Sequence, residues 1–315
     1  MAGLISSGVL IAALGGSLRP ALISGRALQP TRVEGLSFPK QLIDPSGASH
    51  SIESAPRRIV STTLAADETL GALIDPARVV GVTYLADDAR QSSVADLFPD
   101  DIARVGVEIE SLLALEPDLV FVASFTRVET VRLLLATGIP VVRFAELGSF
   151  DGVAQNLRLA GAVLGEEDRA EVLIQEMFTR IAAVERRVAG RTRPRVLAWG
   201  DSGYSKARGT LMDEIIERAG GYNVMRDTGL RGATKIGAEF AIGLEPDVIL
   251  MEGDAGDPER DVAARLLANP TWSQVPAVSG GRVYAHRGAW VSSVTHYRVR
   301  DLEEVARMLH PGAGL

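Results

Sequence analysis

Short apolar runs alternate with amphipathic stretches along most of the chain. The apolar runs are continuous, which is typical of strands buried on both faces of a parallel sheet. They occupy residues 58–61, 79–83, 118–123, 140–144, 193–199, 247–250 and 282–285. Stretches with helical periodicity lie at residues 65–73, 128–136, 211–219 and 299–309. This order predicts an α/β protein whose parallel sheets are covered by helices.

One long amphipathic stretch separates the two halves of this pattern. Its apolar residues have the spacing of a buried helical stripe: Leu173, Ile174, Met177, Ile181, Val184 and Val188. From Glu166 to Ala189 the helix would measure about 36 Å, at about 1.5 Å per residue. We therefore expect an N-terminal lobe that begins with a hairpin, one linking helix and a C-terminal lobe, over residues 28–164, 165–190 and 191–315.

A sequence repeat relates the two halves. The first copy is Glu110-Ser-Leu-Leu-Ala-Leu-Glu-Pro-Asp-Leu-Val-Phe121, and the second is Glu239-Phe-Ala-Ile-Gly-Leu-Glu-Pro-Asp-Val-Ile-Leu250. Each copy predicts a short helix with a carboxylate in its first turn, where the helix dipole favours negative charge, ended by a proline before a buried strand. Each lobe thus exposes one glutamate from an equivalent place. The alternative is that Glu110 and Glu239 only cap surface helices.

The N-terminus has the pattern of a secretory signal. The apolar run of residues 4–14 is followed by Gly15-Gly16 and by Ser24-Gly25-Arg26-Ala27, which resemble a cleavage region. We therefore expect a signal peptide over residues 1–27 and a periplasmic protein. The apolar run is shorter than the roughly 20 residues of a membrane span. No basic residue precedes it, which leaves a buried helix as the alternative.

Composition narrows the class of protein. With 315 residues, the chain exceeds the roughly 250–300 residues at which one hydrophobic core stops growing, which supports two lobes. A net charge of −7 argues against nucleic-acid binding, which needs a basic surface. The absence of cysteine excludes disulfides, thiolate metal sites and cysteine nucleophiles.

Several motifs, taken in order, resemble the periplasmic binding proteins of ABC importers for cobalamin, ferric siderophores and haem. They are Asp44-Pro-Ser-Gly47, Pro56-Arg-Arg-Ile-Val-Ser61, the Leu-Glu-Pro-Asp block, Ala219-Gly-Gly-Tyr-Asn-Val224 and Leu309-His-Pro311. The resemblance implies two Rossmann-like lobes joined by a rigid helix, with the ligand between them. It also implies that Glu110 and Glu239 form salt bridges with arginines of a permease dimer in the inner membrane.

The resemblance also implies that the ligand lies against the loops after the strands. This agrees with the rule that open parallel sheets bind at the carboxyl ends of their strands. Five basic residues in these loops predict an anionic ligand, because guanidinium groups match carboxylates well; the alternative is that they are solvated. Aromatic residues there could supply flat walls. The candidate residues are Thr63, Leu64, Tyr84, Phe125, Arg127, Tyr204, Lys206, Arg208, Arg231, Arg287 and Trp290.

Several ligand classes fit these residues. A bare zinc or manganese ion is disfavoured because the chain has four histidines, His50, His286, His296 and His310, and the first and last lie in the hairpin and the terminal helix. Haem would need an axial ligand such as Tyr84, Tyr204 or His286. We expect a metal chelate, meaning a ferric siderophore, a corrinoid or haem. An anionic carboxylated cofactor such as a quinone is the alternative.

An enzyme is the competing class, because paired Rossmann-like lobes also house metal-centre enzymes and chelatases. No G-x-G-x-x-G follows the first strand, and neither a P-loop nor a nucleophile elbow is present. Asp67 and Glu68 lie in the first turn of a predicted helix, where carboxylates are usually structural. We therefore expect a transport protein without a resident cofactor, catalytic residues or bound metal of its own.

Overall fold

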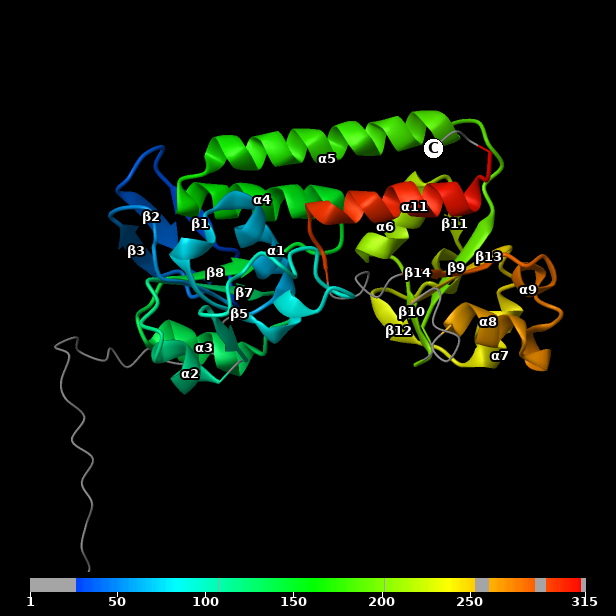
Figure 1. Ribbon diagram of the computed structural model, residues 1–315, viewed down its shortest axis with the longest axis horizontal. Helices are drawn as coiled ribbons and strands as arrows, with labels where there is room; N and C mark the ends of the chain where they lie inside the picture. Colours follow the sequence, from blue (N-terminus) through cyan, green and yellow to red (C-terminus); the bar gives the residue numbers. More distant parts are fainter. Residues whose placement is uncertain (1–26, 107, 201, 253–260, 287–292, 313–315) are drawn as a thin grey trace, which may run out of the picture.

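The computed structural model describes residues 27–106, 108–200, 202–252, 261–286 and 293–312. Two α/β lobes lie side by side beneath a layer of long helices (Figure 1). The predicted signal peptide lies outside the described residues, apart from Ala27. Within the described part of the chain, no helix is both long and apolar enough to cross a bilayer.

The N-terminal lobe contains a parallel sheet with the strand order β6-β5-β4-β7-β8. Its strands are β4 (Ile59–Ser61), β5 (Val79–Thr83), β6 (Ala103–Val105), β7 (Leu119–Ala123) and β8 (Val141–Phe144). Helices α1 (Leu64–Leu73), α2 (Ile109–Leu113), α3 (Val128–Ala136) and α4 (Phe150–Leu164) accompany it. An antiparallel sheet of β1 (Arg32–Glu34), β2 (Lys40–Ile43) and β3 (Ser49–Ile52) precedes it. The β2–β3 pair confirms the predicted hairpin.

The strands of this lobe are apolar throughout because both faces of the sheet are covered. Ile59 and Phe121 face a core that includes residues of α1 and α4. Their neighbours Val60 and Val120 face the opposite core, with residues of α2 and α3. Neighbouring side chains of a strand point to opposite faces, so each strand needs an unbroken apolar run.

The C-terminal lobe contains a mixed sheet with the order β12-β10-β9-β13-β14, and β11 beside β9. Its strands are β9 (Arg195–Trp199), β10 (Tyr204–Lys206), β11 (Tyr222–Asn223), β12 (Ala233–Lys235), β13 (Val248–Glu252) and β14 (Val283–His286). Its short helices are α6 (Leu211–Arg218), α7 (Ala238–Gly243), α8 (Val262–Leu267) and α9 (Pro276–Ser279). The central strands β9, β13 and β14 are parallel, as expected. The sheet as a whole is mixed, because β10 is antiparallel to both β9 and β12.

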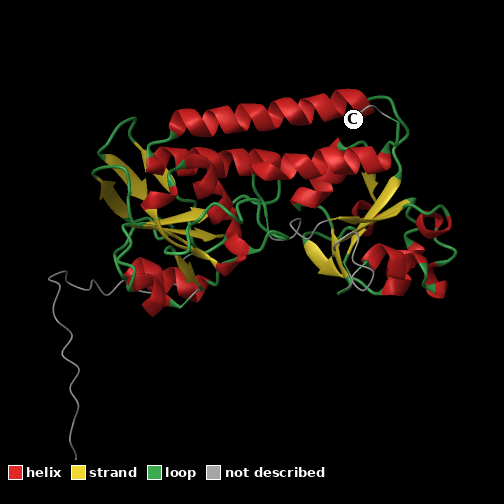
Figure 2. Ribbon diagram, in the orientation of Figure 1, coloured by secondary structure: helices red, strands yellow, loops and turns green. Residues whose placement is uncertain are grey.

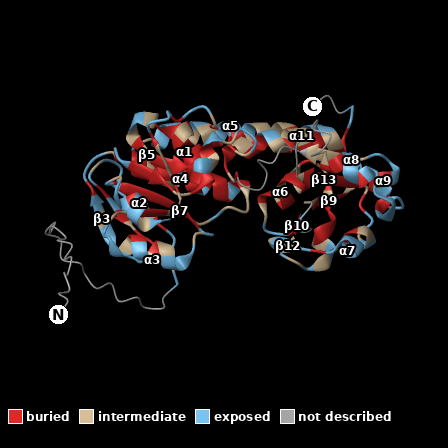
Figure 3. Cartoon of the chain, turned by 60° about the horizontal axis from the view of Figure 1, so that its bottom comes forward, coloured by how far each residue is buried: buried red, intermediate tan, exposed pale blue. Residues whose placement is uncertain are grey.

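A helical layer joins the lobes. Helix α5 (Glu167–Val188) runs over both, with α4 and α11 (Val299–Leu309) end to end below it (Figures 1 and 2). One core cluster includes Phe121 of the first sheet, Ile181 of α5, Leu302 of α11 and Leu250 of the second sheet. Figure 3 shows buried residues inside each lobe, while α3, α5 and α7 carry exposed residues. The expected single linking helix is thus confirmed, and α4 and α11 reinforce it.

Candidate functional site

A cleft of about 880 Å³ is lined by residues of both lobes. The N-terminal wall consists of Thr62–Leu64, Thr83–Leu85, Val105, Gly106, Ser124, Phe125 and residues 145–148. The C-terminal wall consists of Lys206, residues 209–212, Ala233 and Val294. A cleft of this size falls within the range that holds small-molecule ligands.

The N-terminal wall is built where the parallel strands end. Thr63 follows β4 and caps α1, its side chain accepting a hydrogen bond from the backbone N–H of Ala66. Tyr84 follows β5 and Phe125 follows β7, and their side chains are 68% and 66% exposed. Two aromatic rings therefore stand at the cleft with most of their surface open to a ligand.

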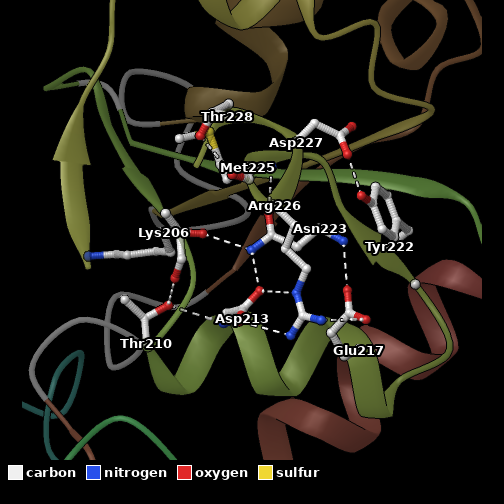
Figure 4. A network of polar contacts seen from close by, with 12 residues as sticks. Lys206, Thr210, Asp213, Glu217, Tyr222, Asn223, Met225, Arg226, Asp227 and Thr228 are labelled. Carbon is white, nitrogen blue, oxygen red and sulfur yellow. Dashed lines mark hydrogen bonds and ion pairs between the residues drawn. The ribbon is translucent and has the colours of Figure 1, made fainter. Parts of the chain in front are cut away.

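A network of polar contacts positions the C-terminal wall (Figure 4). Asn223 donates from Nδ2 to the backbone oxygen of Lys206 at 2.9 Å and to Oδ1 of Asp213 at 2.8 Å. Arg226 donates to both oxygens of Asp213, at 2.8 and 2.9 Å. The backbone N–H of Asp213 donates to Thr210 Oγ1, which caps α6. Strand β10 and the start of α6 are thereby held together at the cleft.

Charge in the cleft is sparse. Among the described residues that line it, Lys206 is the only cation and Glu146 the only acidic residue. Burial lowers the pKa of Lys206, against the attraction of Glu252, and burial raises the pKa of Glu252. Both side chains line a small recess behind the cleft, together with Trp199 and Tyr204. The helices α1 and α6 also begin at the cleft, so the positive ends of two dipoles face it from opposite lobes.

A buried carboxyl group lies below the N-terminal wall. Asp67 has no exposed surface, and its Oδ2 accepts a hydrogen bond from Thr83 Oγ1 at 2.5 Å. Burial raises the pKa of Asp67 to about 7, although hydrogen bonds from Thr83 and Ser61 act in the opposite direction. Its neighbour Glu68 is also fully buried.

The structure brings together only some of the candidate ligand residues. Thr63, Leu64, Tyr84, Phe125 and Lys206 line the cleft. Tyr204 lines the recess instead, with 46% of its surface exposed.

The arginine candidates do not line the cleft within the described residues. Arg127, Arg208 and Arg231 are exposed and are absent from the described lining of the cleft, although the Arg231 guanidinium approaches its edge near Gly209. Arg287 and Trp290 lie outside the described residues. The expected gathering of basic side chains is therefore limited to Lys206 within the described lining.

Sequence reasoning missed several residues of the cleft. Glu146, Leu147 and Gly148 precede α4, a helix that was not predicted, and Val294 precedes α11. Asn223, which organises the opposite wall, lies in the Gly-Gly-Tyr-Asn-Val motif of the resemblance. That motif was the available signal for the network in Figure 4.

The repeat forms equivalent structures in both lobes. Glu110 and Glu239 lie exposed in the first turns of α2 and α7. Glu116 and Glu245 each have a φ of 46°. Among the described residues they are the only non-glycine residues with positive φ.

Carboxylates and arginines hold both turns of the repeat. Asp118 accepts hydrogen bonds from the backbone N–H groups of Arg57 and Arg58, and Asp247 accepts one from that of Arg195. The Arg58 guanidinium donates to the carbonyl of Leu115, and that of Arg195 donates to the matching Leu244.

Metal coordination by the protein finds no support in the described part of the chain. It contains no group of three or more histidine, aspartate or glutamate side chains able to hold a metal ion. His50 contacts Asp44 in the hairpin, and His310 contacts the carbonyl of Ala219. The side chain of His286 lies outside the described part.

Comparisons with known proteins agree with this architecture. A family model for periplasmic binding proteins matches residues 59–288. A cobalamin-binding protein of Halobacterium salinarum is 28% identical over 279 residues, which cover 86% of this chain and 73% of that protein. The apo periplasmic haem-binding protein RhuT of Roseiflexus sp. superposes with a TM-score of 0.68 at 25% identity, covering 82% of this chain and 99% of that one.

A second solved structure supports the fold alone. The molybdate-binding protein MolA of Haemophilus influenzae superposes with a TM-score of 0.73 at 22% identity, covering 87% of this chain and 92% of that one. Since the family model spans most of the chain and both lobes, the chain belongs to the periplasmic binding protein family, whose members bind solutes for transport and are not enzymes.

Proposed function

We propose that this protein binds a metal-chelate ligand, such as a corrinoid, haem or a ferric siderophore, in the cleft between its lobes. The observation that carries the proposal is the cleft itself, which has a volume of about 880 Å³ and walls from both lobes. A bare ion would leave most of that volume to water, since a water molecule occupies about 30 Å³. The relatives with cobalamin and haem in their names support the same class.

The walls also suit such a ligand. Tyr84 and Phe125 offer aromatic faces, and Leu64, Leu211 and Met212 offer apolar surface. Lys206 and the first turns of α1 and α6 favour an acidic group on the ligand, such as a carboxylate or phosphate. An anionic carboxylated cofactor remains the second candidate, because these same groups would bind its carboxylates.

We further propose that the protein acts outside the cytoplasmic membrane and passes its ligand to an ABC importer. Glu110 and Glu239 would contact basic side chains of the two permease subunits. Their exposure and their matched positions in the two lobes support this role. The repeat in the two lobes suits a permease dimer, because equivalent surfaces can meet equivalent subunits.

The test is to identify what the protein binds. Absorbance and native mass spectrometry of the protein as purified would detect a bound chelate, and calorimetry with cyanocobalamin and haemin would measure affinity. Lys206→Met and Tyr84→Ala should each weaken binding by about 1 kcal/mol or more. Arg127→Met is the matched control, since Arg127 is exposed and is not part of the described lining.

Two results would contradict this function. One is tight binding of a metal-free carboxylated compound together with no affinity for either chelate, which would favour the second candidate. The other is chemical conversion of the ligand during incubation.

A further inference from the structure

Two glutamates accept hydrogen bonds from residues of the opposite lobe, next to segments that line the cleft. Glu68 belongs to α1 of the N-terminal lobe, yet its Oε2 accepts hydrogen bonds from Ser293 Oγ and Thr295 Oγ1, both at 2.5 Å. Glu214 belongs to α6 of the C-terminal lobe, yet its Oε2 accepts a hydrogen bond from the backbone N–H of Phe150 at 2.8 Å. The contacts are reciprocal, because each lobe supplies one carboxylate.

Each carboxylate holds a segment that forms part of the cleft wall. Val294 lies between the two hydroxyl residues that Glu68 binds, and it lines the cleft. Gly148 lines the cleft two residues before Phe150, the residue whose N–H donates to Glu214. The wall that one lobe contributes is thus fixed by an acidic side chain of the other lobe.

The contacts around Glu68 are buried. Glu68, Ser293 and Thr295 are 0%, 1% and 3% exposed. The second oxygen of Glu68 accepts a hydrogen bond from the backbone N–H of Ser93 at 2.8 Å, so both oxygens are satisfied. A buried carboxylate that loses such donors is left without compensation for its lost hydration, which strongly disfavours any separation of the partners.

Glu214 is anchored in its turn to the linking helix. Arg218 donates from Nε to Glu214 Oε1 and from Nη1 to Glu185 Oε1 of α5, both at 2.6 Å. This chain of contacts joins the start of α4, helix α6 and helix α5. The position of α4 relative to the C-terminal lobe is therefore tied to the helix that spans both lobes.

The lobes also touch at the level of their backbones. A β-carbon built on Gly148 would lie 2.5 Å from the carbonyl oxygen of Gly209, which is closer than atoms normally approach. Both glycines line the cleft. A side chain at position 148 would therefore collide with the backbone of the other lobe, and glycine permits this close approach.

We propose that Glu68 and Glu214 are positioning residues of the ligand cleft, which hold Val294 and the Glu146–Gly148 segment in place before a ligand arrives. The role of the cleft itself rests on the proposed function. The two carboxylates set the spacing of the lobes, so the protein presents a preformed cleft instead of assembling one around its ligand. Neither residue needs to contact the ligand.

The experiment measures the distance between the lobes directly. The chain has no cysteine, so Ala136→Cys and Ala264→Cys, both at exposed positions, would give one spin label on each lobe. Pulsed dipolar spectroscopy of the otherwise unchanged protein should give one narrow distance distribution. Glu68→Ala and Glu214→Ala should each broaden or shift it.

Conservative and control variants separate positioning from general destabilisation. Glu68→Gln should restore a narrow distribution, because the amide oxygen can accept from Ser93 N–H and the amide nitrogen can donate to the two hydroxyls. Val275→Ala removes buried volume from a core that belongs to the C-terminal lobe alone, so it should lower stability without changing the distance. Glu214 is only partly buried, so its variant is expected to fold even where Glu68→Ala does not.

Ligand affinity supplies a second readout. If the alanine variants leave the cleft correctly formed in about one molecule in ten, their affinity for haemin or cyanocobalamin falls about tenfold. Distance distributions identical to that of the unchanged protein would overturn the proposal, as would equal broadening by Val275→Ala. Failure of the unchanged protein to bind either probe would instead count against the proposed ligand class, and the distances would still decide the positioning role.

Discussion

Asp67 illustrates how a single buried residue couples stability to pH. Its pKa is raised from 3.8 to about 7 in the folded protein. A carboxyl group with a raised pKa favours folding only while it is protonated. Its contribution is therefore complete below about pH 4 and is lost as the pH rises through about 7.

We predict that Asp67→Asn removes this dependence. The free energy of unfolding of the variant, relative to the natural protein, should rise by about 2.5 kcal/mol between pH 5 and pH 8, at about 1.4 kcal/mol per pH unit up to the pKa of about 7. Urea unfolding at both pH values provides the measurement. A difference that stays constant with pH would show that Asp67 does not titrate in this range.

The contacts of individual side chains were only partly predictable from the sequence. The sequence predicted that Asp67 and Glu68 lie in the first turn of a helix, and the structure places Asp67 there and Glu68 directly after it. Their partners could not be found from the sequence, because Thr83 and Thr295 are far away along the chain and hydroxyl residues are common. Lys206 was predicted at the cleft and lines it. Arg208 was predicted there too, but it is exposed and is absent from the described lining. The direction of a side chain in a loop follows no simple sequence pattern, so the sequence could not distinguish these two residues.

The turn after each repeat helix has an unusual backbone conformation in both lobes. Glu116 and Glu245 adopt the left-handed conformation at matched positions, between a short helix and a proline. Such a conformation costs an L-residue about 1–2 kcal/mol, most of all when the side chain is β-branched. The repeat therefore preserves a backbone geometry, in addition to the outward glutamate of each helix.

We predict that Glu116→Val and Glu245→Val each lower the free energy of unfolding by about 1–2 kcal/mol. Glycine at either position should be nearly neutral, since relief of strain offsets the greater freedom of the unfolded chain. Glu129→Val, in the first turn of α3, is the control and should cost less than about 0.7 kcal/mol. Equal losses at all three positions in urea unfolding would remove the argument from strain.

Elements with strong periodicity were predictable, and short ones were not. The spacing of Ile174, Met177 and Ile181 predicted α5 to within a residue at each end. Strands β10 and β12 have three residues each, too few to show a period, so the antiparallel edge of the second sheet was missed. Helix α4 has an N-terminal cap at Ser149 and a C-terminal cap at Gly165, and both residue types are sequence signals for the ends of a helix.

At the scale of the whole molecule, the matched glutamates predict how the protein meets its transporter. Reversing both Glu110 and Glu239 to lysine should abolish uptake, because repulsive contacts replace attractive ones at a cost of several kcal/mol. Folding and ligand affinity should change little, since both residues are exposed. Uptake in cells that express the transporter, with calorimetry on the same variants, is the measurement.

The control for this prediction is a variant with the same change in net charge. Asp168→Lys with Glu176→Lys places two lysines on the exposed side of α5, on the face opposite α2 and α7 in Figure 1. Uptake should persist in that variant. Normal uptake by the Glu110 and Glu239 double variant would remove the docking assignment.

We also predict that the lobes close by only a few degrees on ligand binding. Helix α5 is continuous over 22 residues, and one apolar core includes both sheets. The lobes are therefore joined, within the described residues, by a rigid helix and not by a pair of flexible strands that could act as a hinge. Small-angle scattering should give the same radius of gyration, within error, with and without ligand. A clear contraction would be incompatible with this rigidity.

The shared core also constrains the order in which the protein acquires its structure. Leu302 and Val305 of α11 pack into a cluster that contains residues of both sheets, and α11 is the last described helix of the chain. A polypeptide synthesised from its N-terminus thus exposes apolar surface on both lobes until α11 has been added. Stable folding should therefore require α11, and a product terminated before residue 299 should be degraded as an unfolded chain instead of persisting as a partly active fragment.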